Sequence, residues 1–302
     1  MKAIAFPLIL PFLFVAGLAS AQTQINQTRP VNSDARIDVS NIKGSISVHG
    51  WDKDEVAISG TLGARAKGLS IEGDAAHLQI KVEAPGSTSW FSWGADTAMG
   101  DTTLELKVPR NAQLKLETVS ANVDLSEVNG RSLSVNSVSG KLRLDSGAGE
   151  LEVDSISGSV EINGKASKTH VETVSGSILS RGLGGEIHFE TVSGDIDADN
   201  GGYQRLSADS VSGDIKLRGV PASNAEIDVE SMSGDINLRL PEGVSAKLDA
   251  STFSGDIRSD FGAASKPDHG PGSHLELQLG SAGGEIKIET FSGDIEIRKA
   301  ER

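Results

Sequence analysis

The sequence predicts an all-β protein, a single-chain β-solenoid of about 18–21 residues per coil that follows an irregular N-terminal β cap. A short phrase recurs at nearly constant spacing, and apolar residues alternate with polar ones on both sides of it. The composition agrees, with 35 glycines, 4% aromatic residues and no cysteine. Such a mixture suits short strands and tight turns better than one thick globular core.

The recurring phrase is Thr/Ser-Val-Ser-Gly-Asp-Ile, with small variations. Measured at the apolar residue before Ser-Gly, successive copies are about 18–21 residues apart, a period typical of stacked repeats. The last step alone is twice as long, which predicts one copy degraded by an insertion. The measured positions are Val119, Val138, Ile156, Val174, Val192, Val211, Met232, Phe253 and Phe291.

Each copy carries five apolar residues at fixed offsets. In the copy centred on Val192, Ile187 and Phe189 precede it by five and three positions, and Ile196 and Ala198 follow it by four and six. Alternation with period two predicts two short strands per copy, and we expect all five side chains to face the core. The Ser-Gly pair is the expected bend, because glycine adopts a positive φ without steric cost.

Stacking of the copies explains how such short units bury their apolar side chains. Equivalent strands of neighbouring coils are expected to pair about 4.8 Å apart. A β-sandwich is the rival fold, but it does not predict the same offsets in every copy. We expect residues 22–110 to form the N-terminal β cap and residues 111–302 the repeat β-solenoid, as one folding unit.

Residues 1–21 have the features of a cleaved signal peptide. Lys2 precedes an apolar run at residues 4–18, and Ala-Ser-Ala at 19–21 is a small-residue cleavage site. This run is shorter than the roughly 20 residues that span a bilayer, so an uncleaved anchor is the less favoured alternative. We expect an exported protein, periplasmic or extracellular at the cell surface, with no transmembrane segment in the mature chain.

The charge balance and the lack of cysteine exclude several function classes. The chain has 42 acidic and 28 basic side chains, a net charge of −14. An acidic surface repels phosphate backbones and anionic lipid, so we expect no nucleic-acid partner. Without cysteine there are no disulfides, thiolate metal sites or cysteine nucleophiles.

Three stretches of the chain resemble a known family. They are residues 44–56 with the run His-Gly-Trp-Asp-Lys-Asp-Glu-Val, residues 108–112 (Val-Pro-Arg-Asn-Ala), and the Ser-Gly-Asp-Ile repeats. Over about residues 30–300 the chain resembles the putative-adhesin family of bacterial β-strand-repeat proteins, a domain of unknown function. The resemblance implies an exported or surface β-solenoid with no established catalytic residues, and therefore no active site to carry over.

Aspartates follow the bend glycine in several copies, namely Asp195, Asp214, Asp235, Asp256 and Asp294. We expect a column of carboxylates that is continuous from Asp195 to Asp256. Each carboxylate can accept a backbone N–H at its turn, the column can form a weak cation ladder for calcium, or two carboxylates can act as a catalytic pair. Turn capping is the favoured interpretation of this pattern.

Two histidines, His170 and His188, occupy the same outward position in neighbouring copies. They could share a metal ion, but the sequence pattern supplies no third ligand. We therefore expect no metal site and no cofactor.

An aromatic cluster at Trp90, Phe91 and Trp93 lies in a loop rich in glycine and serine. Flat aromatic rings beside small polar residues suit stacking on sugar rings or contact with an apolar partner. The alternatives are a loop that covers the end of the solenoid, or contact with lipid.

These observations predict a non-enzymatic, exported, adhesin-like interaction module of the bacterial cell envelope, with a glycan or an envelope protein as partner. No Gly-x-Ser-x-Gly elbow or phosphate-binding glycine loop points to an enzyme. The alternatives are a structural or stress-sensing envelope scaffold and, less favoured, a polysaccharide-acting β-helix enzyme.

Overall fold

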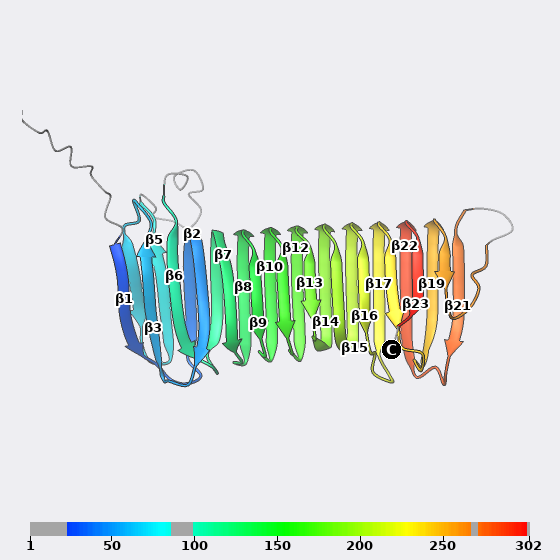
Figure 1. The fold of residues 1–302 in the computed structure, drawn as a ribbon, viewed down its shortest axis with the longest axis horizontal. Coiled ribbons are helices and arrows are strands. Elements are labelled where there is room, and N and C mark those ends of the chain that lie inside the picture. Colours follow the sequence, from blue (N-terminus) through cyan, green and yellow to red (C-terminus); the bar gives the residue numbers. More distant parts are fainter. Residues whose placement is uncertain (1–22, 86–98, 267–270, 301–302) are drawn as a thin grey trace, which may run out of the picture.

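The computed structural model describes residues 23–85, 99–266 and 271–300, and every regular element in these ranges is a β-strand. The strands lie side by side along the longest axis of the molecule (Figure 1). The all-β prediction is confirmed, with 23 strands hydrogen-bonded into one sheet. Within the described ranges, no helix is long and apolar enough to cross a membrane.

The strands are β1 (Thr23–Pro30), β2 (Arg36–Trp51), β3 (Glu55–Leu62), β4 (Gly68–Gly73), β5 (His77–Glu83), β6 (Thr102–Pro109), β7 (Gln113–Val128), β8 (Ser132–Ser139), β9 (Leu142–Ser146), β10 (Glu150–Ser157), β11 (Val160–Gly164), β12 (Lys168–Ser175), β13 (Ile178–Arg181), β14 (Gly184–Ser193), β15 (Ile196–Ser212), β16 (Ile215–Gly219), β17 (Glu226–Ser233), β18 (Ile236–Leu240), β19 (Ala246–Ser254), β20 (Ile257–Ser259), β21 (Ser273–Leu279), β22 (Gly284–Ser292) and β23 (Ile295–Lys299).

In the middle of the molecule, each strand pairs in parallel with the equivalent strand of the copy before and the copy after. Val153 on β10 lies opposite Val135 on β8 and Val171 on β12, which are its equivalents one copy away in each direction. Identical registers follow from the repeat, because each copy offers its neighbour the same backbone groups and the same alternation of side chains. Antiparallel pairs occur near the two ends, in β1–β3, β3–β6 and β4–β5 and again in β19–β21.

The last copies are not stacked in sequence order. β22 pairs with both β17 and β19, and β23 with both β18 and β20, so the final copy lies between two earlier ones (Figure 1). The sequence analysis expected the doubled last step of the repeat to hold a degraded copy, and this expectation was wrong. The segment between β20 and β22 instead supplies β21, which pairs antiparallel with β19 on the side away from β22.

The core is formed by four of the five apolar offsets, not by all five. Ile187, Phe189, Ile196 and Ala198 are 0–3% exposed, whereas Val192 is 45% exposed. Successive side chains of a strand point to opposite faces. Because Phe189 faces the core, Thr191 faces it too and Val192 faces outward, so the expectation for Val192 was wrong. A buried serine or threonine therefore occupies the inner corner of each copy.

Several corner hydroxyls bond across neighbouring copies, whereas those of Ser155, Ser210 and Ser231 have no hydrogen-bond partner among the described residues. Thr173 donates to Thr191 over 3.0 Å and lies 2.9 Å from the carbonyl oxygen of Gly176. Thr118 likewise donates to Ser137 over 3.0 Å. A small hydroxyl side chain fits this corner because it fills little volume, and in some copies it finds a partner in the next copy.

The bend glycines are required by space as well as by conformation. Gly158 has a φ of +139°, and a Cβ added there would lie 2.1 Å from the carbonyl oxygen of Gly140 in the preceding copy. Neighbouring copies thus approach too closely at this bend to admit a side chain, which explains why the Ser-Gly pair recurs along the repeat.

Candidate functional site

An apolar ridge runs along the stack at the residue before each Ser-Gly pair. Its members are 45–61% exposed and account for seven of the eight exposed large apolar side chains in the described ranges. The rings of Phe253 and Phe291 stack at 4.8 Å between centroids, tilted by 8°. In spatial order the ridge consists of Ile156, Val174, Val192, Val211, Met232, Phe291 and Phe253.

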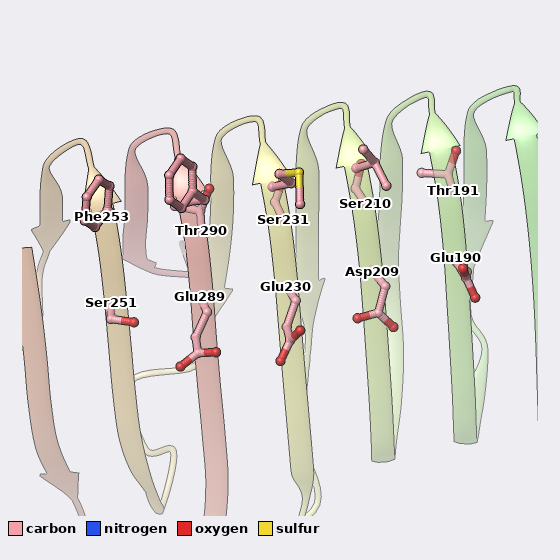
Figure 2. A pocket seen from close by; sticks show the side chains of 13 residues that line it. Glu190, Thr191, Asp209, Ser210, Glu230, Ser231, Ser251, Phe253, Glu289 and Thr290 are labelled. Atoms are coloured by element: carbon pink, nitrogen blue, oxygen red, sulfur yellow. The ribbon is translucent and has the colours of Figure 1, made fainter. Parts of the chain in front are cut away.

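An acidic column lies beside the ridge, two positions earlier in each strand. It consists of Asp154, Glu172, Glu190, Asp209, Glu230 and Glu289, and Ser251 takes the same position in β19. Figure 2 shows Glu190, Asp209, Glu230, Glu289 and Ser251 in one row, with the corner hydroxyls above them. The ridge, the corner hydroxyls and the acidic column line two neighbouring surface grooves.

The predicted aspartates form a ladder in which each carboxylate accepts the backbone N–H of the next. The N–H groups of Asp214 and Asp235 donate to Oδ1 of Asp195 and Asp214 over 3.0 and 3.1 Å. Asp294 then donates to Asp235 over 2.8 Å, and Asp256 to Asp294 over 2.9 Å. The column is continuous from Asp195 to Asp256, but the β22–β23 copy places Asp294 inside it, between Asp235 and Asp256.

One oxygen of each accepting aspartate binds a backbone N–H of the neighbouring copy. These bonds link the copies, whereas the turn capping that the sequence analysis favoured joins groups within one turn. At the end of the ladder, Lys266 Nζ lies 2.7 Å from Asp256 and this hydrogen bond holds the pKa of Asp256 below its usual range. Calcium binding by the ladder stays a prediction.

The predicted histidine pair lies in a cluster with two carboxylates. The rings of His170 and His188 stack at 4.9 Å, and His170 Nε2 is 2.7 Å from Glu172. One ligand atom each from Asp154, His170 and Glu172 lie within 4.8 Å of one another. Burial, then repulsion from Glu152 and Glu172, raises the pKa of Asp154.

The sequence analysis missed both Asp154 and the ridge. Asp154 could have been found because it occupies the position of Glu172 one copy earlier. The ridge could have been found by continuing the alternation from the core residues, which makes every residue before Ser-Gly an outward one. Trp90, Phe91 and Trp93 lie in residues 86–98, outside the described ranges.

The parallel pairing of equivalent strands and the outward apolar ridge define a repeat protein of the all-β class. The sequence matches the family described as Toastrack DUF4097 over residues 34–233 and again over residues 221–298. The chain therefore belongs to the Toastrack DUF4097 family. None of the curated proteins matches it.

Several solved bacterial structures are similar to this chain at low identity. A putative adhesin from Parabacteroides distasonis is 14% identical, with a TM-score of 0.46, and the match covers 92% of this chain and 97% of that one. A putative lipid binding protein from the same species is 12% identical, with a TM-score of 0.42 and coverages of 92% and 97%. A putative adhesin from Bacteroides fragilis is 12% identical, with a TM-score of 0.38 and coverages of 92% and 98%.

Proposed function

We propose that this protein is a non-enzymatic, adhesin-like interaction module of the bacterial cell envelope, wound as a β-solenoid with about 18–21 residues per coil. The parallel registers one repeat apart support the winding. The signal-like residues 1–21 support export to the periplasm or the cell surface.

The apolar ridge is the observation that carries this proposal. A contiguous row of exposed apolar side chains, rimmed by polar residues, is typical of an interaction surface. Single exposed apolar residues are common and need no explanation, but seven in consecutive coils at one position form a patch. Their side chains project from paired strands, so the surface is presented on a rigid support.

The groove also favours binding over catalysis. Glycoside hydrolysis uses two carboxyl groups with different roles, whose surroundings push their pKa values apart. From Glu190 to Glu289 the acidic column instead repeats one carboxylate per copy along the strand faces, beside the same corner hydroxyl and the same ridge position. A repeated surface of this kind suits recognition of an elongated partner.

A binding comparison of three proteins tests the proposal. Purified wild type, a ridge variant (Val211→Ser with Met232→Ser) and a control (Val220→Ser) are applied to isolated envelope fractions and to a glycan array. Val220 is 65% exposed and lies off the ridge, so it matches the chemical change without touching the surface. We expect saturable binding by wild type and control and its loss in the ridge variant. No binding by folded wild type, or equal binding by the ridge variant, overturns the proposal.

Two further arms test the sequence-based alternatives. A variant with Trp90, Phe91 and Trp93 changed to alanine tests whether the aromatic loop recognises glycans. Turnover of acidic or neutral polysaccharides by the wild type would contradict a non-enzymatic role.

A further inference from the structure

We propose that the apolar ridge binds a cationic amphipathic α-helix of a partner protein, which lies along the stacking axis with its apolar stripe on the ridge. This inference rests on the proposed function and specifies the partner. It is carried by the charges on both sides of the ridge and by the spacing of the coils.

Carboxylates flank the second half of the ridge on both sides. The acidic column lies on one side, two positions before the ridge, and the aspartate ladder lies on the other, three positions after it. Ten carboxylates thus accompany the ridge from Val174 to Phe253. Apolar surface between two acidic rows is complementary to a ligand with basic residues on both sides of an apolar stripe.

Basic side chains of the protein neutralise only part of this charge. Lys287 lies 3.2 Å from Glu230 and 2.9 Å from Glu289, on the side of the column away from the ridge. Arg258 and Lys266 pair with the ladder at its far end, and Lys216 lies 3.9 Å from Asp214. Four lysine and arginine groups, with His170 beside Glu172 and His188 beside Glu190 and Asp209, stand against ten carboxylates, so both flanks of the ridge stay acidic.

The dimensions of the ridge suit a single helix. Seven positions at about 4.8 Å per coil span about 29 Å, the length of about 19 helical residues. A helical turn rises about 5.4 Å, close to the spacing of about 4.8 Å between neighbouring ridge residues. Over the whole ridge, the helical turns and the ridge residues therefore shift relative to one another by less than one turn. Alternate residues of an extended strand recur about every 6.7 Å and lose register sooner.

Hydrogen bonding also favours a helix over an extended segment. The inner strands of the stack already pair with neighbours on both sides, so their backbone offers few donors or acceptors to a ligand. A helix satisfies its own backbone groups and needs only side-chain contacts from the surface.

Two other occupants are disfavoured by the same charges. Anionic lipid would meet two rows of carboxylates, and a second copy of this chain would bring its own acidic rows against them. Both are outcomes that the experiment distinguishes.

The test uses a fluorescent helix-forming peptide of about 20 residues, with one apolar stripe flanked by lysines. One comparison peptide carries glutamate in place of lysine, and another has the same composition with the stripe scrambled. We expect saturable binding of the striped cationic peptide alone, by fluorescence anisotropy. Equal affinity for the scrambled peptide would show attraction by charge only and would overturn the proposal.

Variants of the protein locate the binding surface. We expect the ridge variant to bind the cationic peptide at least about tenfold more weakly, and Val220→Ser to bind as wild type does. Asp209→Asn with Glu230→Gln should weaken binding and reduce its dependence on salt, because two of the attracting carboxylates are gone. Unchanged affinity in the ridge variant, at an unchanged thermal midpoint, overturns the proposal.

Vesicles of phosphatidylcholine with phosphatidylglycerol and light scattering of the free protein complete the design. Ridge-dependent binding to vesicles without binding to the peptide would show that the ridge contacts lipid and would overturn the helix. A dimer that is lost in the ridge variant would show that the ridge contacts a second copy of the chain and would also overturn it. Ridge-dependent binding to envelope fractions without peptide binding would refute the helix and leave the proposed function standing. If no binding of any kind depends on the ridge, both the helix proposal and the proposed function are refuted.

Discussion

Replacing Gly158 with alanine tests whether close approach of neighbouring copies at the bends stabilises the stack of strands. Gly158 has a φ of +139°, and a Cβ at this position would lie 2.1 Å from Gly140 O and 2.9 Å from Gly140 C. Both contacts are with backbone atoms, so no side-chain rotation can relieve them. Either the copies that contain Gly140 and Gly158 must move apart at this bend, or the bend must change its conformation.

The expected cost has two parts. A residue with a Cβ loses about 1–2 kcal/mol in a left-handed conformation. Separation of the two copies also weakens the bonds from Gly140 N to Ser157 O and from Leu142 N to Ser159 O, now 3.2 and 3.0 Å long. At about 1 kcal/mol for each bond, the free energy of unfolding should fall by about 3–4 kcal/mol.

Urea unfolding followed by circular dichroism measures this loss, with Gly202→Ala as the matched control. A Cβ on Gly202 has nothing within 4 Å, and Gly202 is not among the positive-φ residues. The control should therefore stay within about 1 kcal/mol of wild type or gain stability, since alanine restricts the unfolded chain. A loss below about 1 kcal/mol for Gly158→Ala relative to this control would refute the role given to the bend glycines.

Three further predictions concern the core, the corner and an outward carboxylate. Phe189→Ala should cost about 3–5 kcal/mol in urea unfolding and Val192→Ala less than about 1, because Phe189 is fully buried and Val192 is 45% exposed; similar losses would contradict this assignment. Thr191→Val should cost less than about 1 kcal/mol, because the Thr173 hydroxyl loses Thr191 but keeps the carbonyl oxygen of Gly176 at 2.9 Å, and a loss above about 2 kcal/mol would contradict this. Burial, with repulsion from nearby glutamates, raises the pKa of Asp154. Its carboxyl therefore stabilises the folded state below the unfolded pKa of 3.8, and this contribution is lost as the pH rises through the higher folded pKa. Asp154→Asn should therefore raise the free energy of unfolding at pH 7 by less than about 1 kcal/mol, and the gain should vanish below pH 3.8; a gain that persists there would refute the assignment.

The sequence predicted the all-β class because a hydrogen-bonded ladder of equal strands imposes equal spacing on the chain. It did not predict where β22 and β23 lie. The copies are so alike that Ile286 suits pairing with Ile227 and with Leu248 equally well. The course of the chain between β20 and β22 decides the neighbour, and irregular segments carry no periodic signal.

The sequence contained the information needed to predict the candidate site, but the residues before each Ser-Gly pair were assigned to the wrong face of the strand. Val192 and its equivalents were placed in the core because they are apolar, whereas alternation from Phe189 makes them outward. Outward apolar positions repeated at a fixed offset in a repeat protein are therefore informative about binding. The acidic neighbours, such as Glu190 and Asp195, could be placed beside them from the same offsets.

The position of β22 and β23 also limits how this protein can change in length. The described chain reaches its last residues between the copies that contain β18 and β20, where Ala300 N donates to Leu240 O. A duplicated copy appended there would find no open strand to extend, because both neighbours are already paired. Duplication or loss of whole copies between β8 and β14 meets no such obstacle, since each copy there presents the same register to the next. The interior copies are therefore where shorter and longer relatives are expected to differ, and the final copy is where they are expected to agree.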